Sequence, residues 1–165
     1  MLKYICAMIM AAALFTNSDN YTAVQKAVDA VNETTPAKSW NGQCLKSVRL
    51  IEKENVVEFT IQNVSGRIPK ADEISNDEII KGGIWYIANY MTGYDYSINE
   101  EDGEGDGEMY KRVGSLLKLM AEKRIGVRLN LNFREGESLS LAVSPQNVKK
   151  AVNMRKNDYY KEFSK

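Results

Sequence analysis

The chain has 165 residues, of which 44% are hydrophobic and 27% charged, so it can bury a core and is neither disordered nor fibrous. Its 22 basic and 22 acidic residues cancel, which argues against a nucleic-acid partner, because proteins that bind nucleic acid carry a surplus of positive charge. The absence of histidine excludes Ser-His-Asp and Cys-His catalysis, and zinc sites with histidine ligands.

The N-terminal residues have the pattern of a secretory signal peptide. Lys3 precedes an apolar run over 4–15, and small residues follow at 16–18. The run is too short to cross a bilayer as a helix, which takes about 20 apolar residues. We therefore predict a signal peptide over 1–18, a periplasmic or extracellular location, and no membrane span in the mature chain. The alternatives are a cut after Ala13 or a buried N-terminal helix.

A single domain is expected over residues 19–152, followed by a polar C-terminal tail at 153–165. Cys44 is the only cysteine left after cleavage, so no disulfide can form within the mature chain. Because Cys44 opens an apolar stretch, we interpret it as a buried free thiol rather than as half of an intermolecular disulfide.

The first part of the domain is predicted to be a helix followed by a β-hairpin. Valine and alanine recur at helical spacing over 21–31. After a loop, residues 44–62 contain two apolar stretches around a short turn, and the second alternates with polar residues as a half-buried strand does. The apolar residues of that second strand are Val57, Phe59 and Ile61.

The middle of the chain is predicted to contain two helices separated by an acidic stretch at 99–108. The capping box over 75–78 starts the first helix. Its apolar stripe consists of Ile80, Ile84, Ile87 and Met91. Two glycines at 82–83 weaken this helix by roughly 1 kcal/mol each, which allows a bend there. The second helix is predicted from 109 to about 124.

The last part is predicted to be a second hairpin and a short helix. Residues 127–134 alternate strictly between apolar and polar, and a second alternating stretch follows at 138–143. Ser144 and Pro145 then supply an N-cap and a first helical residue for a helix that runs to Val152.

These elements predict an α+β two-layer sandwich, in which the two hairpins form one four-stranded antiparallel sheet with helices packed on one face. This is the simplest arrangement that covers the single apolar face of each hairpin. The residues expected to share the buried face are Val57, Phe59, Ile61, Leu129, Leu131 and Phe133.

The first candidate site is the polar face of this sheet. Its predicted partner-binding residues are Arg128, Asn130, Asn132 and Arg134, with Lys46 or Arg49 alongside. Guanidinium and amide groups can hold carboxylates or sugar hydroxyls through directed hydrogen bonds. The alternative interpretation is an ordinary solvated face.

The second candidate site is a group of aromatic residues that lie close together in the sequence: Trp85, Tyr86, Tyr90, Tyr94 and Tyr96. We favour a core role for the group, because large aromatic residues pack in cores more often than they mark binding sites. Tyr94 and Tyr96 follow the predicted helix, so they form the exposed pair and are candidate partner contacts.

The acidic stretch resembles the opening of an EF-hand loop, with oxygen ligands at Asp102, Glu104 and Asp106. The closing position of such a loop requires a bidentate glutamate, and Val113 occupies it here. We therefore predict a flexible connector with no specific metal site, and we predict no cofactor elsewhere.

The order of elements resembles that of small exported bacterial proteins of unknown function, with a helix that ends in Val-Asn, a loop with proline, and two hairpins. The matching segments are Ala30-Val31-Asn32, Pro36, Leu45 to Ile61, and Leu129 to Val152. The resemblance implies no catalytic residues, and the acidic stretch departs from it.

The function expected from these patterns is that of a non-catalytic exported binding module for a protein or a carbohydrate. One alternative is a small enzyme without histidine that uses carboxylates and Cys44. Another is an inhibitor or immunity-type protein that occludes an enzyme.

Overall fold

The computed structural model describes residues 19–38, 42–66, 75–91 and 107–154. The predicted signal peptide and most of the polar tail lie outside the described residues. The same is true of Tyr94 and Tyr96 and of the three candidate metal ligands, Asp102, Glu104 and Asp106.

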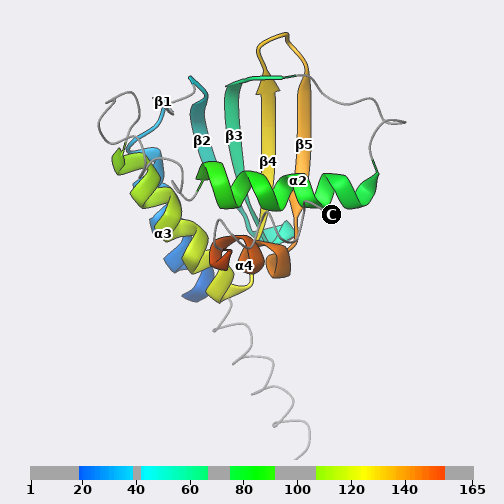
Figure 1. Ribbon diagram of the computed structural model, residues 1–165. Coiled ribbons are helices and arrows are strands. Elements are labelled where there is room, and N and C mark those ends of the chain that lie inside the picture. Colours follow the sequence, from blue (N-terminus) through cyan, green and yellow to red (C-terminus); the bar gives the residue numbers. More distant parts are fainter. Residues whose placement is uncertain (1–18, 39–41, 67–74, 92–106, 155–165) are drawn as a thin grey trace, which may run out of the picture.

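The described chain is α+β, which confirms the predicted class (Figure 1). A helix at residues 19–32 comes first. The strands are β1 (Ala37–Lys38), β2 (Cys44–Ile51), β3 (Val56–Val64), β4 (Gly126–Phe133) and β5 (Ser138–Val143). The later helices are α2 (Asn76–Tyr86), its π-helical extension η2 (Ile87–Met91), α3 (Gly107–Lys123) and α4 (Pro145–Asn153), and a short 3-10 turn, η1 (Glu52–Glu54), joins β2 to β3.

The predicted four-stranded antiparallel sheet is wrong. The sheet has five strands in the order β1-β2-β3-β4-β5, and its central pair, β3 and β4, is parallel. Val56 pairs with Gly126 and Val64 with Phe133, so both strands start at the same end of the sheet. Parallel neighbours need a long crossover connection. The chain between them supplies one, because α2, η2 and α3 return it to the end where β3 began.

The fifth strand, β1, was missed because only two of its residues pair, Ala37 with Leu45 and Lys38 with Cys44. Further along β2, the side chain of Asn32 hydrogen-bonds to the edge that β1 leaves unpaired. Its amide nitrogen donates to the carbonyl oxygen of Val48 at 2.8 Å, and the Val48 N–H donates to its amide oxygen at 2.9 Å. One asparagine therefore takes the place of a strand residue along this edge.

Helices α2, α3 and α4 lie over one face of the sheet (Figure 1). Five of the six residues predicted to share the buried face are buried, with Val57, Phe59 and Leu129 fully so. The exception is Phe133, which is only partly buried at the end of β4, beyond a register shift in its pairing with β3. The core is therefore centred on the parallel pair and not on the hairpin end.

Helix α2 begins with the predicted capping box: the Glu78 N–H donates to the Ser75 hydroxyl at 3.3 Å, and the Ser75 N–H donates to Glu78 at 2.8 Å. That backbone hydrogen bond is the main cause of the lowered pKa of the Glu78 carboxyl. The helix continues through both glycines. Gly83 is buried, and a Cβ atom there would lie 2.8 Å from a methyl group of Val143. The second glycine therefore allows α2 to pack closely on β5.

Ile80 departs from the predicted apolar stripe of α2. Ile84, Ile87 and Met91 are buried as expected, but Ile80 is 45% exposed. The reason is the position of the helix, whose N-terminal half extends past β5 and beyond the sheet (Figure 1). In the described chain no strand follows β5 at this edge of the sheet.

Candidate functional site

The side of β2 to β5 that faces away from the helices is called the open face here. Cross-strand pairing arranges its side chains in rows. The first row contains Arg49, Glu58, Arg128 and Ala142. The second contains Ser47, Thr60, Asn130 and Ser140, and a shorter one pairs Asn132 with Ser138. Three of the four residues predicted from the sequence, Arg128, Asn130 and Asn132, are thus neighbours on one face.

The first row is an ion-pair network. Glu58 lies between two arginines, 2.9 Å from an Nη atom of Arg49 and 3.6 Å from one of Arg128. Arg128 also donates to Glu54, which comes from the turn η1. This hydrogen bond lowers the pKa of the Glu54 carboxyl and raises the pKa of the Arg128 guanidinium. Arg128 is therefore held in place, whereas the side chain of Arg49 is 71% exposed.

The other rows are held by hydrogen bonds between serine and asparagine. The hydroxyl of Ser140 donates to the amide oxygen of Asn130 at 2.8 Å, and that of Ser138 donates to Asn132 at 2.7 Å. These bonds orient both amides. No described residue accepts a hydrogen bond from the amide N–H groups of Asn130 and Asn132, so these donors are available to a partner.

A shallow depression of about 570 Å³ lies on the open face beside β2. Charged and hydroxyl side chains line most of it: Thr35, Lys46, Ser47, Arg49, Glu58 and Thr60. Lys46 and Arg49 are exposed, while only 12% of the Glu58 side chain is exposed between its two arginines. The accessible charge of the depression is therefore positive, which suits a carboxylate.

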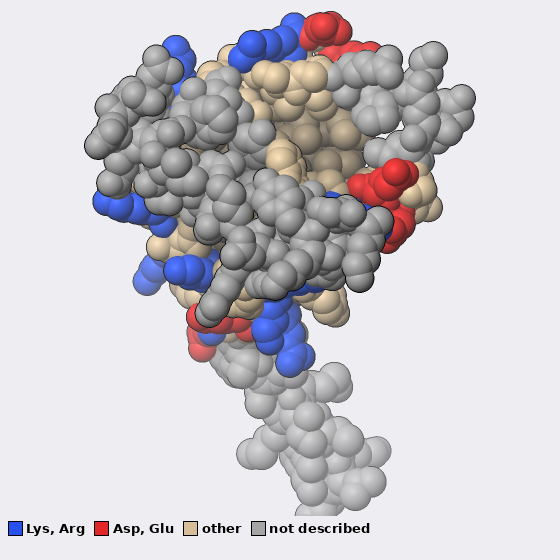
Figure 2. All heavy atoms as spheres, viewed as in Figure 1, with Lys and Arg blue, Asp and Glu red and all other residues tan. Residues whose placement is uncertain are grey.

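Basic side chains also occur at the margins of the open face. Arg134 follows the end of β4 and donates to the carbonyl oxygen of Asn63 at 3.2 Å, so it is displaced from the other predicted residues. Lys38 is exposed, and strand alternation places it on this side because Ala37 is buried. On the helix side, side chains of both signs are visible among the described residues (Figure 2). Among the described residues, the open face and its margins therefore carry more basic than acidic side chains.

Glu58 and Thr60 belong to this face, although they were not among the predicted site residues. Their alternation with Val57, Phe59 and Ile61 was visible in the sequence. What the sequence did not show is that β3 lies directly beside β4, which brings Glu58 next to Arg128.

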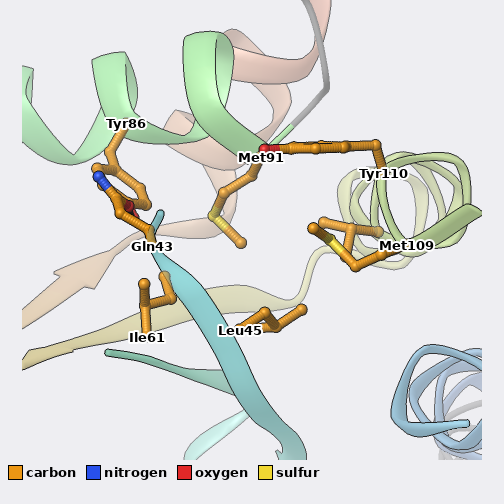
Figure 3. A pocket seen from close by; sticks show the side chains of 8 residues that line it. Gln43, Leu45, Ile61, Tyr86, Met91, Met109 and Tyr110 are labelled. Carbon is orange, nitrogen blue, oxygen red and sulfur yellow. Dashed lines mark hydrogen bonds between the residues drawn. The ribbon is translucent and has the colours of Figure 1, made fainter. Parts of the chain in front are cut away.

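A second feature is a cavity of about 40 Å³ between the helices and the sheet (Figure 3). Its lining includes Tyr86, Met91, Met109 and Tyr110. The hydroxyl of Tyr86 donates at 2.5 Å to Gln43, the one buried polar residue of the described chain. The cavity is far smaller than the roughly 300 Å³ that small-molecule sites need. We therefore assign these side chains to the core.

The predicted core role of the aromatic group agrees with Tyr86, which is buried, and with Trp85, which packs against the core. The side chain of Tyr90 lies outside the description. Cys44 is a free thiol, but it is only half-buried, because it lies on the open face next to Leu45, which points to the core.

In the part of the chain that the structure describes, no three acidic or cysteine side chains come together in a group that could hold a metal ion. None of the described helices is both long and apolar enough to cross a membrane. Comparison of the chain with known protein families, with curated proteins and with solved structures found no match.

Proposed function

We propose that the protein is an exported, non-catalytic binding module whose open face contacts an acidic surface of a partner protein. The observation that carries this proposal is the charge of that face. Its basic side chains are Lys46, Arg49 and Arg128, with Lys38 and Arg134 at its margins, against Glu58 and the turn residue Glu54. Complementary charge favours encounter with an acidic partner and disfavours partners with a basic surface.

The fixed geometry of the open face supports the same proposal. Asn130 and Asn132 are oriented by serines, and Arg128 is held by Glu54 and Glu58. A partner that binds to groups already held in position loses less side-chain entropy on association. The face is thus suited to recognition by hydrogen bonds and charge, with the exposed Arg49 as an accessible cation.

A protein partner fits these residues better than a carbohydrate. Neutral sugars offer hydroxyl groups, which Asn130, Thr60 and Ser47 can bind, but they carry no negative charge to pair with the lysine and arginine side chains. Carboxylates of an acidic protein match those cations directly. On β2 to β5, none of the side chains that point to the open face is aromatic and able to stack on a sugar ring.

Reversal of the charge beside the depression tests this proposal. We expect Lys46→Glu with Arg49→Glu to weaken binding at least about tenfold, because both cations would then repel an acidic partner. The tagged protein is used to capture its partner from an extract of its native cells, and the affinity of the captured protein is measured for each variant.

The matched control is Lys118→Glu with Lys149→Glu, which makes the same change in net charge at exposed positions of α3 and α4. A partner that binds the control and the wild type equally, but not the reversed variant, supports the open face. Equal capture by all three proteins would contradict it. Recovery of a polysaccharide in place of a protein would contradict the choice of partner.

Export is tested by the N-terminus of the protein isolated from its native host. We expect a mature chain that begins near Asp19, because the apolar run and the small residues at 16–18 form a cleavage pattern. N-terminal sequencing of protein from the cytoplasmic and exported fractions measures this. A chain that begins at Met1 or Leu2 in the cytoplasm would refute export while leaving the open face as a binding surface.

A further inference from the structure

The two edges of the sheet differ. The outer edge of β2 is completed by β1 and by the side chain of Asn32. The outer edge of β5 pairs with no strand of the described chain. Edge strands usually carry a charged residue, a proline or a bulge that blocks pairing with another chain. β5 has the sequence Ser-Leu-Ser-Leu-Ala-Val and a regular register, so it has none of these.

The backbone groups available at this edge follow from the pairing of β5 with β4. The Phe133 N–H donates to the carbonyl oxygen of Glu137 at 2.8 Å, so this pair is hydrogen-bonded. Hydrogen-bonded and non-bonded pairs alternate along an antiparallel ladder. The N–H and C=O groups of Ser138, Ser140 and Ala142 therefore point away from β4, toward the free edge.

The side chains of β5 are symmetric about Ser140: a leucine flanks it on each side, and a small residue follows each leucine. We propose that β5 pairs with β5 of a second copy of this chain, antiparallel and centred on Ser140. This register pairs Ser140 with itself and Ser138 with Ala142, with roughly six backbone hydrogen bonds. It also places Leu139 beside Leu141 of the second copy on the helix side, where adjacent apolar side chains favour pairing.

Helix α2 supports the same arrangement by an independent observation. It packs on β5 at Gly83, and Ile80 lies about one turn nearer the N-terminus of the helix, in the part that extends past β5 (Figure 1). Ile80 is the only large hydrophobic side chain of the described residues that is exposed. In the dimer this part of α2 would extend over the second copy, and the sheet of that copy would cover Ile80.

The two α2 helices do not collide in this register. Val143 lies opposite Glu137 of the second copy, so the helices cross the paired strands about 20 Å apart, which exceeds a helix diameter of about 10–12 Å. The N-terminal part of each α2 then reaches the hairpin end of the other copy, where Phe133 and Leu139 are only partly buried. Figure 2 shows a hollow lined by uncharged side chains on the helix side of this region.

Pairing at β5 goes beyond the proposed function and does not depend on it. It would join the two sheets and place both open faces on the same side, so that a partner with two acidic sites could bind both copies. Linked sites of this kind bind more tightly than single ones.

The central position of Ser140 allows a charge-swap experiment. Ser140 is exposed, and in the proposed register it lies directly opposite itself. We expect Ser140→Lys alone and Ser140→Asp alone to dissociate the dimer, because like charges would face each other across the edge. An equal mixture of the two variants should restore it. Sedimentation equilibrium at low ionic strength, with protein produced from the full chain, measures the mass.

The controls are Ser47→Lys and Ser47→Asp, which place the same charges on exposed β2. We expect the wild type and both controls to have twice the mass of one chain, each Ser140 variant to have the mass of one chain, and their mixture to return to twice that mass. A wild type with the mass of one chain at every concentration would overturn the proposal. So would Ser140 variants that dimerise as the wild type does, or a mixture that stays monomeric.

Discussion

Replacement of Phe59 by alanine is expected to lower the free energy of unfolding by about 3–5 kcal/mol. Phe59 is fully buried at the middle of β3, between Val48 of β2 and Leu129 of β4. Its removal leaves a cavity below the helices, and strands that are paired on both sides cannot move to fill it. Urea denaturation followed by circular dichroism measures the change.

The control for this prediction is Phe133→Ala. This substitution removes the same kind of side chain, but Phe133 lies at the end of β4 and is only partly buried. We expect the free energy of unfolding to fall by only about 1–2 kcal/mol. The substitution removes less buried apolar area than Phe59→Ala does, and it leaves no closed cavity. Equal destabilisation of the two variants would show that Phe133 belongs to the core, which would then extend to the hairpin end.

Alanine at the two adjacent glycines of α2 is expected to change stability in opposite directions. Gly82 is exposed in the middle of the helix, and a Cβ atom there meets nothing within 4 Å. Gly82→Ala should therefore raise the free energy of unfolding by about 0.5–1 kcal/mol, since alanine loses less backbone entropy. Gly83→Ala should lower it by about 1–3 kcal/mol, because the new Cβ atom would lie 2.8 Å from a methyl group of Val143.

A double variant locates the cause of the Gly83 effect. Val143→Ala removes the methyl group that the new Cβ atom would meet, so Gly83→Ala should cost less in that background than in the wild type. Thermal and urea unfolding of the four combinations measure the coupling. Costs that simply add, or a Gly83→Ala variant as stable as Gly82→Ala, would show that α2 does not pack on β5 at this residue.

The sequence predicted the individual elements well because the interactions that define them are local. The capping box at Ser75 joins residues three positions apart, and Ser144 caps α4 in the same way. The alternation of 127–133 places Leu129 in the core and Asn130 on the open face without knowledge of any neighbour. The predicted site residues Arg128, Asn130 and Asn132 follow from that alternation alone.

The strand order was beyond the sequence because it depends on long-range contacts. A hairpin specifies the direction of its own two strands but not that of the next hairpin. Two antiparallel hairpins can be joined by either an antiparallel or a parallel central pair. The parallel arrangement arises because the chain between Val64 and Gly126 forms helices that carry it back to the start of β3. The same contacts expose Ile80, since the position of α2 is set by Gly83 and Val143.

The sequence by itself determined the α+β class, the main helices, four of the five strands, and the alternation that places most apolar side chains of β3 and β4 in the core, because spacing and capping act over a few residues. Only the tertiary structure decided the parallel pair, the use of Asn32 at the edge of β2, and the neighbours of Glu58. It also decided that basic residues from β1, β2 and β4 share one face while β5 remains at an edge. Residues distant in the sequence become neighbours only when the strands pair, and the order of pairing is set by packing across the whole domain.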